Sequence, residues 1–466
     1  MKIELAKTEI IHFVGIGGIG MSGLSLIMNG MGFKVQGSDV ANNKNISRLK
    51  KNRIKISINH AKKNIEKATI LVVSSAIKKN NPELIEARRK QLPIYKRGEM
   101  LAHIVSLTKN IVVTGSHGKT TTTSLLAAIF SKTKLDPTII NGGVLNSLNN
   151  SAKLGKSDWC ILEADESDGS FVHVSPTYSI VTNIDREHMD YYKSMNDLKN
   201  LFVSFINKVP SFGKSFICID DKNNAELLKK IKIKNYYTYG TSLKAQFHIK
   251  NIKQEKEFSE YNLSIKLPGK KNININKIKI PLLGLHNVRN ATAAVAVAST
   301  IGISKEIIKK GLSEFKGVQR RFNKIFTFRE TNFYDDYAHH PTEIKEVLNG
   351  IRAAHKKDEI ICVFQPHRIS RLKDLKKEFS LSFKKANTVI LCPVHTAGEK
   401  IRLGFSYNSF AKEIIKKSKV KLFLIKDQHQ LAKLIKHNIY GKKIVVGMGA
   451  GTISSWMNEL PKLLKC

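Results

Sequence analysis

The chain lacks most of the features that mark specialised protein classes. Its five cysteines form no C-x-x-C pair and show no metal-site spacing, so neither a disulfide scaffold nor a zinc module is indicated. Cys160, Cys362 and Cys392 lie inside apolar runs and are expected to be small core residues. No fixed-period repeat and no low-complexity linker is present. These absences indicate a globular protein of a reducing compartment.

Long uninterrupted hydrophobic runs are also missing. One apolar stretch, from Ile10 to Phe33, could imitate a signal peptide or a membrane anchor, but seven glycines and several polar residues interrupt it. A strand, a turn and a helix explain this stretch better. We therefore expect a cytoplasmic protein that does not bind membranes.

Acidic residues are scarce: 38 Asp and Glu stand against 78 Lys and Arg, which gives a formal net charge of +40. Such an excess is typical of proteins that bind nucleic acid, anionic membranes or polyphosphates. The lysines, however, are spread along the whole chain beside Ile and Asn, outside the glycine-rich motifs. This distribution favours solvated basic faces over a nucleic-acid surface, although the charge can still attract small polyanions.

The length of 466 residues and the alternation of apolar strands with helical stretches predict an α/β protein of three domains in series. We expect these domains at residues 1–107, 108–317 and 318–466. The first contains a strand, a glycine turn and a helix near 21–31. The second begins with a strand, a loop and a helix near 120–130, and the third consists of four strand-and-turn units with helices between them.

The segment HFVGIGGIGMSG, residues 12–23, predicts a phosphate-binding turn. Gly15, Gly17 and Gly20 fit G-x-G-x-x-G between a short strand and a helix, and Asp39 follows at the distance of a ribose-binding acid. Taken alone, the pattern indicates NAD. A dehydrogenase, however, has no use for a second phosphate loop, and the chain contains one.

That second loop, TGSHGKTT, occupies residues 114–121. Backbone N–H groups near Gly118 and the following helix can hold phosphate oxygens, Lys119 can reach the β- and γ-phosphates, and Thr120 can ligate magnesium. The loop departs from G-x-x-x-x-G-K-[ST] because Val113 stands at the first glycine position. Its strand and helix nevertheless favour an ATP site over a chance turn.

An acidic segment, EADESD, follows an apolar strand and places Glu163, Asp165, Glu166 and Asp168 close together. Such a cluster repels itself, so a divalent cation or a basic ligand is expected nearby, with Glu163 facing Mg²⁺ at the end of the strand. A surface acidic loop is the alternative. His188 comes at a comparable point of the next strand, where it is either a ligand or a structural residue.

Two segments of the third domain carry further candidates. Asp335, Asp336, His339 and His340 precede a helix that starts with proline, so they are either functional residues or ordinary caps. In VFQPHRISR, the pair Arg368 and Arg371 suits a carboxylate or a phosphate better than a core.

These segments, with VVSSAI, GLHNVRNATAA and QRRF, occur in the order found in the Mur ligases, and the chain resembles that family from end to end. The resemblance implies a Rossmann-like first domain for a UDP-sugar, a central P-loop-type ATPase and a Rossmann-like third domain that closes over ATP and an amino acid. It implies an enzyme of peptidoglycan precursor synthesis that uses ATP and Mg²⁺ to join L-alanine to the lactyl carboxylate of UDP-N-acetylmuramate through an acyl phosphate. A monomer or homodimer is expected.

Three alternatives remain: a ligase that attaches a tripeptide to the same sugar, an NAD-dependent dehydrogenase, and a basic ATPase that binds nucleic acid. The GIGGIGMSG form of the first motif favours the alanine-adding branch of the family. Several relatives carry a carbamylated lysine fifteen residues after the metal histidine, where this chain has Val203. The alanine-adding branch also lacks that lysine.

The resemblance also implies residue roles. The UDP-sugar would be bound by Gly15, Gly17, Gly18, Gly20, Asp39 and Ser74. ATP would be bound by Gly115, Ser116, His117, Gly118, Lys119, Thr120, Thr121, Asn287, Asn290 and Asp336, and magnesium by Thr120, Glu163 and His188. The amino acid and the muramyl carboxylate would be held by Tyr337, His339, Arg368 and Arg371. The residues acting in catalysis would be Lys119, His188, Arg321, His339, Arg368 and Arg371.

Overall fold

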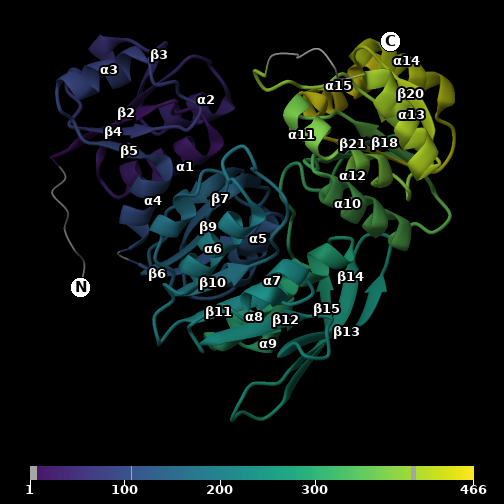
Figure 1. The fold of residues 1–466 in the computed structure, drawn as a ribbon, viewed down its shortest axis with the longest axis horizontal. Helices are drawn as coiled ribbons and strands as arrows, with labels where there is room; N and C mark the ends of the chain where they lie inside the picture. The colour runs from purple at the N-terminus through teal and green to yellow at the C-terminus, as the bar shows by residue number, and fades with distance from the viewer. Residues whose placement is uncertain (1–7, 107, 400–405, 466) are drawn as a thin grey trace. The chain divides into compact units, whose positions relative to one another are not determined.

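The computed structural model describes residues 8–106, 108–399 and 406–465; the predicted boundary at residue 107 and Cys466 lie outside this part of the chain. Within it, three sheets of five, ten and six strands follow one another along the sequence and alternate with helices (Figure 1). This arrangement confirms the predicted α/β class, and the three sheets agree with the expectation of domains in series. Of the helices in the same residues, none has both the length and the apolar character that crossing a bilayer requires.

The chain divides into two compact units, each of which is described by itself. One comprises Met1–Lys250, Asn262–Ile278 and Arg289–Lys316, and the other Asn251–Tyr261, Lys279–Val288 and Gly317–Cys466. The first two sheets therefore belong largely to the first unit, and the third sheet belongs to the second. The limits of the three predicted domains stay a prediction.

The first sheet has the strand order β3-β2-β1-β4-β5, with every pair parallel. Its elements are β1 (Ile10–Val14), α1 (Ile19–Gly30), β2 (Lys34–Asp39), α2 (Lys44–Lys51), β3 (Lys55–Ile58), η1 (Lys62–Ile65), β4 (Ile70–Val73), α3 (Pro82–Arg89), β5 (Ile94–Lys96) and α4 (Arg97–Val105). The helix predicted near 21–31 is α1, which begins two residues earlier. Because β1 lies between β2 and β4, the strand order reverses there, which is where open α/β sheets bind ligands.

The second sheet has the order β15-β14-β13-β12-β11-β10-β6-β9-β7-β8. Its elements are β6 (Lys109–Thr114), α5 (Lys119–Phe130), β7 (Thr138–Leu145), β8 (Asn150–Lys153), β9 (Trp159–Glu163), η2 (Ser170–His173), β10 (Tyr178–Val181), α6 (Met195–Ile206), β11 (Lys214–Cys218), α7 (Lys222–Leu227), β12 (Tyr236–Gly240), β13 (Phe247–Gln254), β14 (Ser259–Ile265), β15 (Ile273–Ile280), α8 (Leu285–Thr300) and α9 (Lys305–Ser313). The strand β6 lies between β9 and β10 and is buried after its first residue, as its continuous apolar run requires.

The first two sheets share a hydrophobic core. Met21 and Leu24 of α1 belong to the same buried cluster as Val112 of β6 and Phe171 of η2. Helix α1 also approaches β8 so closely that a Cβ on Gly23 would lie 3.2 Å from the Cβ of Ala152. The N-terminal glycine turn and the phosphate loop are therefore held by one packed interior.

The third sheet has the order β16-β17-β21-β18-β19-β20, parallel except for the β16–β17 pair. Its elements are β16 (Asn323–Phe328), β17 (Thr331–Asp336), α10 (Pro341–Ala354), β18 (Glu359–Phe364), α11 (Ile369–Asp374), α12 (Lys376–Leu381), β19 (Thr388–Leu391), α13 (Tyr407–Ser418), β20 (Lys421–Leu424), α14 (Gln428–Asn438), β21 (Lys443–Met448) and α15 (Ile453–Lys465). The first strand-and-turn unit predicted here is a hairpin whose two turn residues, Arg329 and Glu330, both have positive φ. A turn of this kind normally carries Asn-Gly, and because Arg-Glu stands here instead, the hairpin could not be recognised from the sequence.

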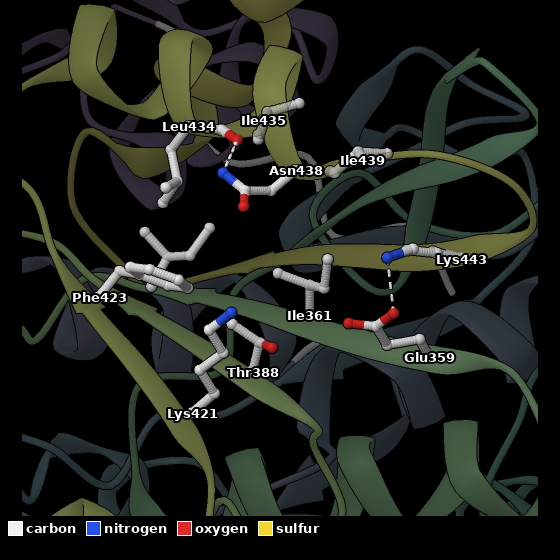
Figure 2. A pocket seen from close by; sticks show the side chains of 11 residues that line it. Glu359, Ile361, Thr388, Lys421, Phe423, Leu434, Ile435, Asn438, Ile439 and Lys443 are labelled. Atoms are coloured by element: carbon white, nitrogen blue, oxygen red, sulfur yellow. Dashed lines mark hydrogen bonds and ion pairs between the residues drawn. The ribbon is translucent and has the colours of Figure 1, made fainter.

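A cavity of about 130 Å³ lies between the third sheet and helix α14 (Figure 2). Its polar lining includes Glu359, Thr388, Lys421 and Lys443, which are the first residues of β18, β19, β20 and β21. In Figure 2 the Nζ of Lys443 is turned to Glu359, 2.6 Å away, and α14 covers the other side. Ligands of open α/β sheets bind at the opposite, carboxyl ends of the strands, so this cavity is a packing feature and does not belong to the candidate site.

Candidate functional site

The N-terminal glycine turn follows β1 directly. Gly15 has a φ of +82°, and a Cβ at this position would lie 3.1 Å from the Cβ of Ser74. Helix α1 begins behind Gly18 without a side-chain cap, so no cap competes for its first N–H groups. The structure thus brings the predicted Gly15, Gly17, Gly18, Gly20 and Ser74 together around a helix N-terminus that can accept an anion.

Asp39 ends β2 and faces the same turn. Its Oδ2 accepts a hydrogen bond from the Gly17 N–H at 2.8 Å, and its Oδ1 accepts one from the Ala41 N–H at 3.1 Å. In this structure Asp39 shapes the turn. A carboxylate has further lone pairs, so the predicted ribose contact remains open to it and stays a prediction.

Sequence reasoning missed a buried carboxylate beneath this turn. Glu83 is fully buried, accepts a hydrogen bond from Ser38 Oγ at 2.6 Å and lies 3.4 Å from His12 Nε2 and 3.2 Å from His60 Nδ1. Burial raises the pKa of Glu83, but hydrogen bonds from His12, Ser38 and Asn64 outweigh that effect and lower the pKa to about 2. In the sequence, Glu83 lies two residues after Asn81, which caps α3. A glutamate in the first turn of a helix is common, so the sequence did not mark Glu83 as a buried functional group.

Ser38 connects this network to the turn. Its carbonyl oxygen accepts hydrogen bonds from the N–H groups of Gly15 and Ile16, at 2.9 and 3.0 Å. The buried carboxylate therefore holds the strand end on which the glycine turn rests.

The phosphate loop joins β6 to α5, and its two glycines are required by their surroundings. Gly115 has a φ of +127°, and a Cβ there would lie 2.2 Å from Thr182 Oγ1. Gly118 has a φ of +85°, and a Cβ there would lie 2.5 Å from Asn290 Oδ1. Asn290 of α8 thus lies against the phosphate loop. This contact is expected if Asn290 and the loop bind the same ATP molecule. Thr121 is buried in the first turn of α5.

Lys119, the first residue of α5, is surrounded by acceptors. Its Nζ donates to Glu166 Oε2 at 2.6 Å and to the carbonyl oxygens of Gly115 and Ser116 at 2.7 and 3.2 Å. Burial opposes the charge of Lys119, but the nearby carboxylates of Glu166, Asp165 and Glu163 outweigh burial and raise its pKa above the usual range. The residue is an ammonium ion at any physiological pH.

Ser116 and His117 are tied to the segment that follows β10. Ser116 Oγ accepts a hydrogen bond from the Asp185 N–H at 2.9 Å, and His117 Nε2 lies 3.0 Å from Asp185 Oδ2. The Asn183 side chain accepts the His117 N–H at 2.9 Å. These contacts hold in place the part of the loop that precedes Gly118 and Lys119.

Two groups of potential metal-ligand atoms lie close to Lys119 in the chain or in space. In the first, Thr120 Oγ1 donates to Glu163 Oε2 at 2.9 Å, at the carboxyl end of β9. In the second, Asp165, Glu166 and His188 place one ligand atom each within 4.8 Å of one another. The structure therefore associates the predicted metal ligand His188 with Asp165 and Glu166, and the other two predicted ligands with each other.

The second group is suited to a divalent cation. Glu166 is 1% exposed, and its Oε1 is buried 3.9 Å from His188 Nε2, with no hydrogen-bond partner among the residues that the structure describes. Burial and the charges of Asp165 and Glu187 raise the pKa of Glu166 to about 7, although Lys119 opposes this. A hard cation with oxygen ligands would satisfy this atom and reduce the repulsion. The acidic segment is thus more than an exposed surface loop.

The predicted residues of the third sheet gather at the carboxyl ends of β17 and β18. The Tyr337 ring lies against two guanidinium groups, with the Arg320 and Arg321 Cζ atoms 4.6 and 5.3 Å from its centroid. Asp336 accepts hydrogen bonds from the Phe322 and Ala338 N–H groups, each at 2.7 Å. Burial raises the pKa of Asp336 to about 6, although Arg321 and these N–H groups oppose the shift.

In the segment before α10 the structure shows a helix cap, and a functional role for the other residues stays a prediction. His340 caps the helix, since its Nδ1 accepts the Thr342 N–H at 3.3 Å. The His339 ring instead faces Tyr337 and His367, with centroids 5.1 and 5.9 Å away.

His367 and His395 are further candidates that sequence reasoning did not single out. Their rings stack with centroids 5.3 Å apart, and Arg371 Nη1 lies 3.5 Å from His367 Nδ1. Burial and the charges of His339 and Arg371 lower the pKa of His367 to about 3, so its imidazole is neutral. Arg368 has a φ of +66°, and its N–H donates to the His395 carbonyl at 2.9 Å. In the sequence, the one feature that could have indicated His367 as a site residue is its position directly before the predicted Arg368.

Asn287 lies one turn before Asn290 on α8, so the two side chains share a helix face. The Asn287 side chain donates to the Leu283 carbonyl at 2.8 Å. The adenine contacts implied for both residues stay a prediction.

Comparison with known proteins finds relatives over the whole chain. Family profiles described as "Mur ligase family, catalytic domain", "Mur ligase middle domain" and "Mur ligase, glutamate ligase domain" match residues 10–109, 113–298 and 320–451. The UDP-N-acetylmuramate--L-alanine ligase of Pelagibacter ubique (strain HTCC1062) is 81% identical over 464 residues, which cover 100% of both chains. A protein of the same name from Bartonella bacilliformis is 41% identical over 466 residues, 100% of this chain and 98% of that one.

A solved structure is similar over its full length. The crystal structure of UDP-N-acetylmuramate-alanine ligase from Thermotoga maritima matches with a TM-score of 0.81 at 26% identity, covering 98% of this chain and 99% of that chain. Sequence and fold comparisons thus point to the same group of proteins.

Proposed function

The chain belongs to the Mur ligase family, and from this premise we infer that it is an ATP-dependent ligase that joins L-alanine to UDP-N-acetylmuramate. The observation that carries the inference is 81% identity, over the whole length, to a ligase of that name. A tripeptide ligase, a dehydrogenase and a nucleic-acid-binding ATPase are not favoured. The enzyme forms an amide bond in peptidoglycan precursor synthesis.

This function accounts for two phosphate sites in one chain. The glycine turn after β1 has the backbone N–H donors that bind a diphosphate. A UDP-sugar and NAD both contain a diphosphate, so the turn can bind either one. The loop before α5 has the lysine and hydroxyl that a nucleoside triphosphate needs. We therefore assign the UDP-sugar to the first site and ATP to the second.

The reaction runs in two steps. A lactyl carboxylate oxygen attacks the γ-phosphorus of ATP, the bond to the β–γ bridging oxygen breaks, and ADP leaves. The amine nitrogen of L-alanine then attacks the carbonyl carbon of the acyl phosphate, phosphate leaves, and the nitrogen loses a proton. Because two anions must meet in the first step, the ammonium of Lys119 acts chiefly by neutralising charge that develops on the transferred phosphoryl group.

We propose that the enzyme uses Mg²⁺, with Thr120 and Glu163 at one position and His188 at another. The unpartnered Glu166 Oε1 and the carboxylate of Asp165 support the second position. When bound, Mg²⁺ supplies positive charge at the phosphate oxygens. Ser116 and His117, fixed by Asp185, orient the loop on which Lys119 approaches the same oxygens.

We propose that the third domain binds the amino acid and contacts the nucleotide. Tyr337, His339, Arg368 and Arg371 form the amino-acid and carboxylate side, and Arg321 and Asp336 form the nucleotide side. The guanidinium groups suit carboxylates, and the neutral imidazole of His367 beside Arg371 adds a hydrogen-bonding group without further charge. Exclusion of water from this region would protect the acyl phosphate from hydrolysis.

The place of action and the partners follow from the substrates. ATP and a UDP-sugar are cytoplasmic metabolites, so we propose a cytoplasmic enzyme that acts as a monomer or homodimer. We propose that the net charge of +40 is solvated lysine and that nucleic acid does not stimulate ATP turnover.

Calorimetry on the ligand-free protein tests the first-site assignment. UDP-N-acetylmuramate should bind with micromolar affinity, and NAD should not compete with it. Alanine and a tripeptide can then be compared as acceptors in the full reaction, where only alanine should be consumed. Micromolar NAD binding without UDP-sugar binding would overturn the assignment.

A further inference from the structure

Arg97, the first residue of α4, lies beside the glycine turn, and its helix packs against the segment that follows the acidic cluster. Its side chain packs on Gly20 in the first turn of α1, where an added Cβ would lie 3.0 Å from Arg97 Nη1 and 3.4 Å from its Cζ. Helix α4 itself packs against η2, the short helix that directly follows the acidic cluster. The guanidinium thus lies at the glycine turn, and the helix that carries it packs against the segment that follows the acidic cluster.

This guanidinium has no protein partner in the described part of the chain. Across residues 8–106, 108–399 and 406–465, Arg97 makes no side-chain hydrogen bond and no ion pair. Asp165 is engaged elsewhere, since its Oδ2 accepts the Ser167 hydroxyl at 2.8 Å and its Oδ1 lies 3.8 Å from Lys119 Nζ. A half-buried guanidinium carries five N–H donors, so leaving them without protein acceptors favours binding of an external anion.

The backbone of Arg97 is held firmly in place. The next residue, Gly98, is buried, and a Cβ there would lie 2.2 Å from the Oγ of Ser170, the first residue of η2. On the other side, the Glu99 side chain accepts the Lys96 N–H at 2.7 Å. Because η2 directly follows the acidic segment, these contacts fix the origin of the Arg97 side chain between the two sites.

We propose that Arg97 binds an anionic oxygen of the UDP-sugar between the glycine turn and the acyl-phosphate site. The proposal rests on the proposed function for the identity of the substrate. Two groups of that substrate have the required chemistry, the diphosphate and the lactyl carboxylate, and a planar guanidinium can hold either one with two parallel hydrogen bonds.

A structural role for Arg97 makes a different prediction. If the guanidinium only balanced the charge of the acidic cluster, its removal would weaken ATP binding at least as much as UDP-sugar binding. If it binds the sugar substrate, the loss falls on the sugar alone, and lysine restores only part of it because lysine cannot form the paired contact.

The test compares R97Q and R97K with the wild type and with K96Q, which removes one positive charge from the exposed neighbouring residue. Binding of UDP-N-acetylmuramate is measured by calorimetry, and KM values for the sugar and for ATP come from phosphate release. UDP-N-acetylglucosamine serves as a second probe, because it carries the diphosphate and lacks the lactyl carboxylate. Melting temperatures report folding, and R97K decides the test if R97Q does not fold.

In R97Q we expect the affinity for UDP-N-acetylmuramate to fall on the order of tenfold to a hundredfold, with R97K between R97Q and the wild type and K96Q unchanged. The KM for ATP should stay within about twofold. An equal loss for UDP-N-acetylglucosamine assigns the contact to the diphosphate, and a loss for the muramate alone assigns it to the carboxylate. Wild-type affinity in R97Q, or an equal loss for ATP, overturns the proposal. Failure of the wild type to bind the UDP-sugar would instead overturn the proposed function.

Discussion

The Nζ of Lys119 lies 2.6 Å from the Oε2 of Glu166, inside the acidic cluster of the second domain. The same ammonium also donates to the carbonyl oxygens of Gly115 and Ser116. Its three donors are therefore all engaged by protein acceptors, and a bound triphosphate must replace at least one of them. This arrangement keeps the lysine charged and pointed along its own loop before the nucleotide arrives.

Replacing Lys119 by alanine should slow the phosphoryl transfer. We expect kcat to fall on the order of a hundredfold to a thousandfold, because the lost contact strengthens as charge develops in the transition state. UDP-sugar binding, measured by calorimetry, should survive, since it belongs to the first domain. The control is Lys132→Ala, which removes an exposed lysine just beyond the end of the same helix. Amide formation at the wild-type rate by Lys119→Ala would contradict the role given to this residue.

Replacing Gly118 by alanine should weaken ATP binding beyond what backbone strain explains. The residue has a φ of +85°, and its Cβ would lie 2.5 Å from Asn290 Oδ1. The matched control is Gly269→Ala, where φ is +70° and nothing lies within 4 Å of the added Cβ. Both variants should lose roughly 1–2 kcal/mol of stability from the left-handed backbone. Only Gly118→Ala should lose kcat/KM for ATP, on the order of tenfold or more; equal kinetics for the two would contradict the account.

Replacing Glu83 by glutamine should remove a pH-dependent part of the stability. The folded pKa of about 2 lies below the ordinary 4.5, so the carboxylate stabilises the fold above pH 4.5, and this stabilisation is lost as the pH falls through 2. The difference of about 2.5 pKa units corresponds to roughly 3 kcal/mol at neutral pH. Urea unfolding of the two proteins should show a stability gap that is constant from pH 7 to about 5 and narrows below pH 4.5. A gap that widens on acidification would show that the histidines, and not the carboxylate, control this network.

Replacing Arg371 by alanine should raise the KM for L-alanine or for the UDP-sugar and leave the KM for ATP unchanged. The guanidinium lies 3.5 Å from His367, among the residues assigned to carboxylate binding. The control, Lys373→Ala, removes an exposed cation from the same helix and should behave as the wild type. An increase confined to the KM for ATP would move Arg371 to the nucleotide side.

The phosphate sites could be predicted from the sequence because their chemistry is local. Gly15, Gly115 and Gly118 are needed for backbone conformations that only glycine adopts easily, and each lies within a few residues of the helix that receives the anion. The α/β class followed in the same way from the alternation of apolar strands and helices. Such patterns can be recognised without knowing what packs against them.

The rest depended on contacts between distant parts of the chain. Glu83 of α3 meets His12 of β1 and His60 of the segment between β3 and η1 only because the fold brings these parts of the chain together, and nothing near Glu83 in the sequence marks it as buried. The stacking of His367 on His395 and the contact of Arg97 with Gly20 arise in the same way. A single sequence shows which residues carry charge, but it does not show which of them lose contact with water.

The most direct test of the ligase assignment is a phosphate-release assay in which ATP, Mg²⁺, UDP-N-acetylmuramate and L-alanine are each omitted in turn. Phosphate and ADP should form only in the complete mixture, in a one-to-one ratio with the UDP-N-acetylmuramoyl-L-alanine product. Hydroxylamine in place of alanine should trap the acyl phosphate as a hydroxamate. Equal ATP hydrolysis without the UDP-sugar, or full turnover with a tripeptide and none with alanine, would contradict the assignment.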